Sequence, residues 1–194
     1  MEKTKEKKRY FTTYRVVFIA VMAAIVYVLT LFRFPLLGSK VHFANAMCLL
    51  SGLLFGPVCG GLAAGIGSAL NDALAGGYDF IQCLITLVSK FAMAAICALI
   101  AGTPHRDKTN HFRVVLGSVI GALSYVALYM LKTYIYQRYV YGNPLDGVWA
   151  AMLGKLPASM INAVFAMIVA PLLYAALIPP LKRANLLEKL GASQ

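Results

Sequence analysis

Long runs of apolar residues without a charge are the feature that most constrains the fold of this chain. Residues 16–32 and 163–177 contain no Asp, Glu, Lys or Arg. A helix needs about 20 predominantly apolar residues to cross the hydrocarbon core of a bilayer, and several runs approach that length. The chain is 60% hydrophobic and 13% charged, whereas soluble domains carry roughly 25% charged residues. We therefore predict an integral membrane protein.

Turn residues and charged segments divide the apolar sequence into candidate transmembrane helices. Six are expected, at residues 16–32, 42–55, 58–74, 80–100, 112–136 and 155–177. The second is short for a span and ends at Gly56-Pro57, so five spans plus a re-entrant segment is the alternative. The predicted fold is an all-α bundle of six transmembrane helices. Its membrane domain covers residues 16–180, between terminal tails at 1–15 and 181–194.

The distribution of positive charge predicts how the chain is oriented in the membrane. The net charge is +11, and most of the basic residues lie in the N-terminal tail, in the segment 103–113 and in the C-terminal tail. The opposite side has only Arg33, Lys40 and Arg138. Cytoplasmic segments are enriched in Lys and Arg, so we expect both termini in the cytoplasm. A short basic tail that leads directly into an apolar run is typical of a membrane anchor, so we expect no nucleic-acid partner.

Three consecutive helices carry polar side chains in their predicted outer halves and apolar side chains in their inner halves. The polar positions are Gln82, Thr86, Ser89, Lys90, Ser124, Tyr125, Tyr129, Lys132, Thr133, Tyr136, Lys155, Ser159 and Asn162. Their near-helical spacing places each set on one stripe of its helix. Ionisable groups in a membrane are costly and face a cavity or a partner. We therefore predict a pocket that opens to the outer side above an apolar floor, with Asn71 and Asp72 at its rim.

Each of these polar residues also has an interpretation without a ligand. Lys132 and Lys155 are close enough to helix ends to extend into the membrane interface. Asp72 and Lys90 are candidates for mutual neutralisation, and the tyrosines of residues 112–136 are candidates for an interfacial aromatic belt. Lys90 is the hardest to explain in this way, because it lies about halfway along its helix.

Motifs for catalysis and for metal binding are absent from the sequence. No GxxxxGK[ST] loop occurs, so the chain is not expected to hydrolyse ATP. Ser68 lies in the sequence GIGSA, but a serine protease needs a general base and no His follows His111. The four cysteines form no CxxC pair and are expected to be buried apolar side chains. We predict no catalytic residue, no cofactor and no metal.

Small residues predict close helix packing in two places. Glycines within residues 56–65 form overlapping GxxxG pairs, a spacing that lets helices approach closely in a bilayer. In the first helix, Ala20, Ala23 and Ala24 lie in the predicted cytoplasmic half, away from the pocket. Packing within the chain is the simpler interpretation of these alanines, and a docking groove for another membrane protein is the alternative.

The segment GSKVHFANAMCLLSGLLFGPVCGGLAAGIGSALNDALAGGYDF resembles the substrate-binding S components of energy-coupling factor (ECF) transporters, particularly the riboflavin-type group. Their pattern has a Lys-containing outer loop, an apolar helix that ends in Phe-Gly-Pro, and a Gly-rich helix with an Asp near its outer end. The matching residues here are Lys40, Asn45, Phe55, Gly56, Pro57, Gly60, Gly65, Gly67 and Asp72. The size, the six-helix topology and the spacing of Ala20 and Ala24 also resemble the family.

The resemblance implies a function as well as a fold. An S component captures a vitamin or related micronutrient at the outer face of the membrane. It docks through alanines of its first helix onto a transmembrane T component driven by two cytoplasmic ATPases, and it topples to deliver the substrate. A multi-pass protein of the bacterial cytoplasmic membrane, surrounded by lipid, is implied. Phe91 follows Lys90 where family members often have Gly, so we expect a narrower pocket.

The predicted substrate site combines tyrosines and a tryptophan with polar groups that orient a ligand. Its residues are Lys40, Asn45, Asp72, Tyr78, Gln82, Lys90, Tyr125, Tyr129, Lys132, Trp149 and Asn162. The lysines suit an anionic or carbonyl-rich compound. Riboflavin, a pyridoxine-like compound, a pyrimidine precursor and a modified nucleobase all remain open. The alternatives from other classes are an assembly or structural subunit without a ligand, in which polar stripes hold the helices together, and a membrane enzyme.

Overall fold

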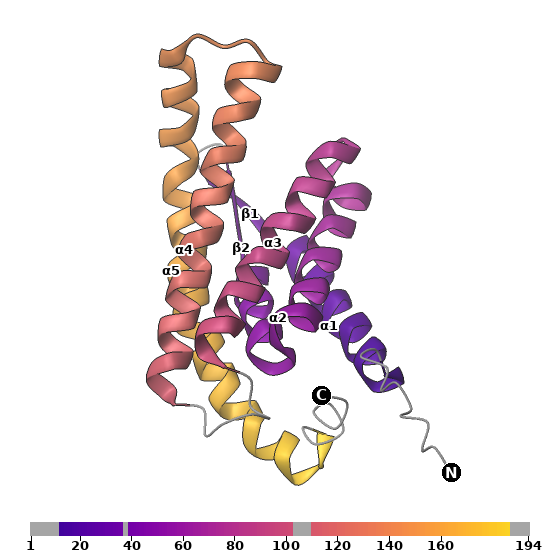
Figure 1. The fold of residues 1–194 in the computed structure, drawn as a ribbon. Helices are drawn as coiled ribbons and strands as arrows, with labels where there is room; N and C mark the ends of the chain where they lie inside the picture. The colour runs from indigo at the N-terminus through magenta and orange to yellow at the C-terminus, as the bar shows by residue number, and fades with distance from the viewer. Residues whose placement is uncertain (1–11, 37–38, 103–109, 187–194) are drawn as a thin grey trace, which may run out of the picture.

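Five helices dominate the part of the chain that the computed structural model describes, residues 12–36, 39–102 and 110–186 (Figure 1). They are α1 (Thr13–Leu31), α2 (Ala44–Asn71), α3 (Phe80–Ala101), α4 (His111–Ile135) and α5 (Leu145–Arg183). Two short π-helical segments, η1 (Asp72–Gly76) and η2 (Tyr136–Val140), extend α2 and α4. Strands β1 (Arg33–Leu36) and β2 (Ser39–His42) pair antiparallel between α1 and α2. Each of the five helices, counted with its π-helical extension, is long and apolar enough to cross a membrane.

α2 reverses direction at Gly56, so its two halves lie antiparallel. Gly56 has φ 79° and ψ −178°, a backbone conformation that is essentially restricted to glycine. Pro57 follows, and its fixed φ suits the first turn of a helix. The Sγ atom of Cys48 lies 3.8 Å from the Oγ atom of Ser68. In one straight helix these two residues would be about 30 Å apart, so the chain folds back between them.

The reversal divides α2 into two helical halves, which correspond to the second and third predicted helices. Residues 44–55 form the first half of α2 and rise only about 18 Å, less than the ~30 Å thickness of a hydrocarbon core. Five elements of spanning length are therefore present in the described residues, and the count of six transmembrane helices stays a prediction. The start of α1 and the end of α5 lie at the same end of the bundle (Figure 1). The side of the membrane on which that end lies also stays a prediction.

Most of the predicted helix boundaries lie within a few residues of the observed ones, but α5 begins well before its predicted start at Lys155. Pro144 precedes α5, and Asp146 lies in its first turn. Both residues favour the start of a helix, because Pro lacks the N–H that would be unpaired there and a carboxylate stabilises the positive end of the helix dipole. Residues 137–154, which fall between two predicted helices, are therefore largely helical. The terminal tails fall mainly in residues 1–11 and 187–194, which lie outside the described residues.

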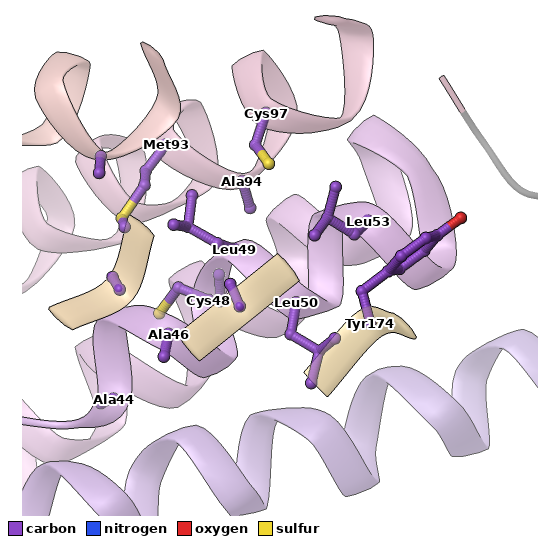
Figure 2. Packing of buried hydrophobic residues seen from close by; sticks show 14 of the residues in the cluster. Ala44, Ala46, Cys48, Leu49, Leu50, Leu53, Met93, Ala94, Cys97 and Tyr174 are labelled. Atoms are coloured by element: carbon purple, nitrogen blue, oxygen red, sulfur yellow. The ribbon is translucent and has the colours of Figure 1, made fainter. Parts of the chain in front are cut away.

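The core is built around α2. In its most hydrophobic stretch of 18 residues, 72% of the residues are buried. Figure 2 shows leucines of α2 packed among side chains of α3 and α5. The residues labelled there include Leu49, Leu50 and Leu53 of α2, Met93, Ala94 and Cys97 of α3, and Tyr174 of α5. All four cysteines are buried, as predicted.

Glycines of α2 allow backbone to approach backbone. A Cβ atom added at Gly60 would lie 2.4 Å from the carbonyl oxygen of Ser51, in the other half of α2. The Ser51 hydroxyl donates a hydrogen bond to the Gly60 carbonyl at 2.9 Å. At Gly67 an added Cβ atom would lie 2.4 Å from the carbonyl oxygen of Ala23 in α1. The small residues of this segment therefore serve packing within the chain.

We predict that Gly60→Ala destabilises the protein, because the new methyl group would overlap backbone atoms that have no room to move. Overpacking of this kind costs about 1–3 kcal/mol. Gly147→Ala in α5 is the matched control, since the nearest atoms to its added Cβ atom are 3.8 Å away. Thermal unfolding in detergent should show a lower midpoint for Gly60→Ala than for the unsubstituted protein, and an unlowered midpoint for Gly147→Ala. Equal midpoints would contradict the antiparallel packing of α2.

Candidate functional site

A cavity of about 470 Å³ lies at the end of the bundle opposite the start of α1 and the end of α5. Its wall is formed by most elements of the fold. These are the end of α1, the β hairpin, the end of α2 with η1, the start of α3, the end of α4 and the first half of α5. The lining residues are Thr30, Arg33, Pro35, His42, Ser68, Asp72, Tyr78, Thr86, Ser89, Lys90, Tyr125, Tyr129, Lys132, Lys155, Ser159 and Asn162. Its volume is within the range of roughly 300–1,000 Å³ that is usual for small-molecule sites.

The three polar stripes meet at this cavity, together with the end of α2. The predicted site residues that line it are Asp72, Tyr78, Lys90, Tyr125, Tyr129, Lys132 and Asn162. Asn45, Gln82 and Trp149 do not belong to its lining. Lys40 pairs with Pro35 through the backbone of β2, and its side chain lies outside what the structure describes.

Lys90, Asn45 and Tyr125 form a contact at the floor of the cavity. The Lys90 ammonium is 3% exposed and donates a hydrogen bond to Oδ1 of Asn45, which is itself 2% exposed. The Lys90 Nζ atom also lies 3.6 Å from the centroid of the Tyr125 ring. A buried charge needs such partners, because an unpaired one is costly in an apolar interior. The contact joins α2, α3 and α4, so Asn45 supports the site from behind its lining.

Asp72 faces the cavity, whereas its neighbour Asn71 faces α1. The Asp72 carboxylate accepts a hydrogen bond of 2.6 Å from the Thr86 hydroxyl of α3. Asn71 is fully buried and its amide donates to the Tyr27 carbonyl at 3.3 Å. Asp72 and Lys90, considered as a neutralising pair from the sequence, therefore each have a different hydrogen-bond partner.

Tyr78 closes over the cavity from the turn between η1 and α3. Gly77 has φ 66°, a left-handed conformation that glycine adopts at little cost. An added Cβ atom at Gly76 would lie 2.7 Å from the Tyr78 ring, so the absence of a side chain there makes room for the ring. Burial raises the pKa of Tyr78, and the nearby Asp72 carboxylate adds to the effect. The tyrosine hydroxyl therefore stays protonated and able to donate a hydrogen bond at neutral pH.

Gln82 and Trp149 have positions that the sequence did not indicate. The Asp79 carboxylate accepts hydrogen bonds from the Gln82 backbone N–H at 2.7 Å and from its side-chain amide at 2.9 Å. These bonds lower the pKa of Asp79 and cap the start of α3, so Gln82 belongs to the helix end. Trp149 is 54% exposed on α5 and contributes nothing to the lining.

The prediction that Phe91 narrows the pocket is wrong. A Cβ atom added at Gly61 would lie 2.7 Å from the Phe91 ring, which shows that the ring packs on the glycine face of α2. Phe91 is not a lining residue.

The β hairpin supplies lining residues that were not predicted. Arg33 of β1 donates to the Ala75 carbonyl in η1 at 2.7 Å. The backbone N–H of His42 in β2 donates to Oδ1 of Asn162 in α5 at 2.9 Å. Both bonds hold the hairpin against the cavity wall. A sequence signal was available, because residues 33–42 form a short stretch between two apolar helices and contain Gly38, and glycine is common in turns.

The alanines of α1 divide between two surfaces. Ala20 and Ala24 are exposed. Ala23 is 6% exposed and lies against Gly67 of α2. Ala23 therefore packs within the chain, and Ala20 and Ala24 share an outer face that is open to a partner or to lipid.

Comparisons with known proteins agree with the fold. A family model described as "ECF-type riboflavin transporter, S component" matches residues 10–178. A relative from Pyrococcus woesei, described as "Uncharacterized protein in gap 3'region", is 36% identical over 107 residues, which are 54% of this chain and 68% of that protein. A solved structure described as "Structure and mechanism of the S component of a bacterial ECF transporter" is 24% identical with a TM-score of 0.62. The match covers 87% of this chain and 97% of the other, so the two share a fold.

We predict that Asn45→Ala destabilises the protein, because the buried Lys90 ammonium loses its acceptor. A hydrogen bond to a charged group contributes about 1.5–3 kcal/mol. Lys90→Met and the double variant complete a cycle, since the loss at Asn45 should largely disappear once the ammonium is gone. The unfolding midpoint in detergent is measured for the unsubstituted protein, the two single variants and the double variant. Additive losses in the double variant would show that the two side chains are not coupled.

Proposed function

The chain belongs to the ECF-type riboflavin transporter S component family, so it is a substrate-binding subunit of an ECF transporter, and we propose that it captures a water-soluble vitamin or related micronutrient at the outer face of the membrane. An S component is not a catalytic enzyme. ATP hydrolysis belongs in this proposal to partner subunits, because the sequence has no GxxxxGK[ST] loop.

The observation that supports the proposal best is the cavity between the hairpin and the ends of the helices. Its wall combines aromatic rings with groups that form directional hydrogen bonds, which is the usual composition of a small-molecule site. The Asp72 carboxylate and the Asn162 amide come from different helices, so a ligand that contacts both is oriented by the bundle. The Lys90, Asn45 and Tyr125 contact closes the floor.

The energising partners in this proposal are a transmembrane T component and two cytoplasmic ATPase subunits. Exposed small side chains on α1 support a docking role, since Ala20 and Ala24 lie on one face of the helix. Small residues let a partner helix approach closely within a bilayer. This face lies near the middle of α1, whereas α1 contributes to the cavity lining through Thr30 near its end. Docking there would leave the cavity unobstructed, and toppling of the S component would carry the substrate inward.

The membrane in this proposal is the bacterial cytoplasmic membrane. The charge distribution of the sequence supports cytoplasmic termini, because most of the basic residues lie in the tails and the segment 103–113. The cavity is at the opposite end of the bundle from the start of α1 and the end of α5. With that orientation the cavity opens toward the outer side.

A retained ligand is the direct test of substrate capture. We expect mass spectrometry of the protein purified in mild detergent to detect one small organic molecule in near-stoichiometric amount. Asp72→Asn keeps an acceptor oxygen for Thr86 but replaces the other carboxylate oxygen by an N–H donor, so a ligand that donates a hydrogen bond to Asp72 should bind about tenfold or more weakly. Asp146→Asn, an exposed acidic residue on α5, is the matched control. A folded protein that retains no molecule would instead favour an assembly subunit.

The docking face is tested by transport in cells that contain the T component and both ATPases. Ala20→Phe and Ala24→Phe should reduce ATP-driven uptake about tenfold, because bulky rings prevent a close helix contact. Val28→Phe, on the same exposed face but nearer the cavity, is the control. Ligand binding by purified protein should be unchanged in all three variants. Normal uptake by Ala20→Phe and Ala24→Phe would exclude this face as the docking surface.

A further inference from the structure

The cavity has an excess of positive charge. Its lining includes the basic side chains of Arg33, Lys90, Lys132 and Lys155, whereas Asp72 is the acidic residue among the described lining residues. Charge within a membrane protein is costly unless a partner compensates it. Some of these basic groups already have hydrogen-bond partners in the described part of the protein, and others do not.

Two of the basic groups are used by the protein itself. The Arg33 guanidinium donates to the Ala75 carbonyl at 2.7 Å. The Lys90 ammonium donates to Asn45 and lies against the Tyr125 ring. Both groups hold elements of the wall together.

Lys132 of α4 and Lys155 of α5 differ from these two. Within residues 12–36, 39–102 and 110–186, neither ammonium has a hydrogen bond or an ion pair. The nearest aromatic contacts of Lys132 are at 5.5 Å from the Tyr78 centroid and 5.9 Å from the Tyr136 centroid, which are long for a strong interaction. Lys132 is attracted by the Asp72 carboxylate, which is one acidic group among four basic ones in the lining. The two lysines come from neighbouring helices and line the same cavity, and the charge of Lys155 repels that of Lys132. An anion placed between them would relieve that repulsion and form charge-assisted hydrogen bonds.

Aromatic rings lie beside the two lysines. The Tyr125 and Tyr129 rings are 6.2 Å apart with an interplanar angle of 23°. Lys90 covers Tyr125, whereas Tyr129 and Tyr78 also line the cavity. Flat tyrosine faces favour a planar ring through stacking.

We propose that the substrate of this site is a planar organic anion, whose carboxylate or phosphate binds Lys132 and Lys155 while its ring packs on Tyr129 and Tyr78. This inference rests on the proposed function, because it names the substrate class of the same cavity. A neutral ring compound would fit the aromatic wall but would leave the excess of positive charge in the cavity uncompensated.

Matched pairs of compounds that differ in charge test the inference. The pairs are flavin mononucleotide with riboflavin, pyridoxine 5′-phosphate with pyridoxine, and nicotinate with nicotinamide. Titration calorimetry on the full-length protein in phosphatidylcholine nanodiscs should show at least one anion binding about tenfold or more tighter than its neutral counterpart. That preference should decrease as salt is added, because salt screens charge. Any molecule retained through purification and identified by mass spectrometry should also be an anion.

Replacing each of the two lysines by uncharged glutamine tests the same inference on the side of the protein. Lys132→Gln and Lys155→Gln should each lower the affinity for the anion about tenfold and leave the affinity for its neutral counterpart unchanged. The unfolding midpoint of the ligand-free variants should change little, because neither ammonium forms a hydrogen bond or an ion pair within the described residues. Lys182→Gln, exposed at the far end of α5, is the control and should change neither affinity.

The outcomes separate the inference from the proposed function. Three results would overturn the anionic substrate and leave the proposed function of substrate capture standing. They are equal or tighter binding of the neutral compounds, a neutral retained molecule, and anion binding that neither lysine variant changes. Absence of any binding, together with no retained molecule, would overturn both. Phosphatidylglycerol nanodiscs distinguish a solute from a lipid headgroup. Loss of soluble anion binding in those nanodiscs would assign the lysines to lipid and contradict the inference.

Discussion

The cost of exposing a charge or a strong hydrogen-bonding group to hydrocarbon is the constraint on which this structure depends. Lys90 lies in the middle of α3 and cannot reach either interface, so its ammonium requires partners inside the bundle. Asn45 of α2 and Tyr125 of α4 provide them, and in doing so they fix three helices around one point. The space above that point is the cavity. One buried charge therefore accounts for the floor of the site and for the convergence of the polar stripes.

The reversal of α2 makes this arrangement possible. On a continuous helix, Asn45 and Asp72 would be separated by about 40 Å, more than the thickness of the hydrocarbon core. Because the chain folds back at Gly56-Pro57, Asn45 reaches Lys90 at the floor while Asp72 reaches Thr86 on the wall. The glycines that follow the turn let the second half of α2 pack tightly against the first half and against α1. The Phe-Gly-Pro sequence is thus a structural requirement of the site, although it contributes no side chain to the lining.

The resemblance to ECF S components is confirmed by the family match, and the sequence also indicated much of the site. Helical spacing together with the cost of intramembrane charge was enough to bring Lys90, Lys132 and Asn162 to one cavity. The same reasoning could not show that Gln82 bonds to Asp79 at the start of α3 and does not line the cavity, because this capping contact depends on the local backbone. Trp149 falls between two of the predicted helices, whereas in the structure it is an exposed residue of α5, which begins earlier than predicted. Arg33 and His42 were missed because no hairpin was expected: Arg33 was considered only for its charge, and His42 was placed at the start of a predicted helix.

An experimental structure of the protein with the molecule that copurifies from its native host is the measurement that tests the central claim most directly. The claim predicts density for a single small molecule between Asp72, Tyr129 and Lys155, above the Lys90 ammonium and with protein beneath it. Lipid tails in the cavity would contradict it. So would a continuous water-filled path through the bundle, or a ligand bound elsewhere on the molecule.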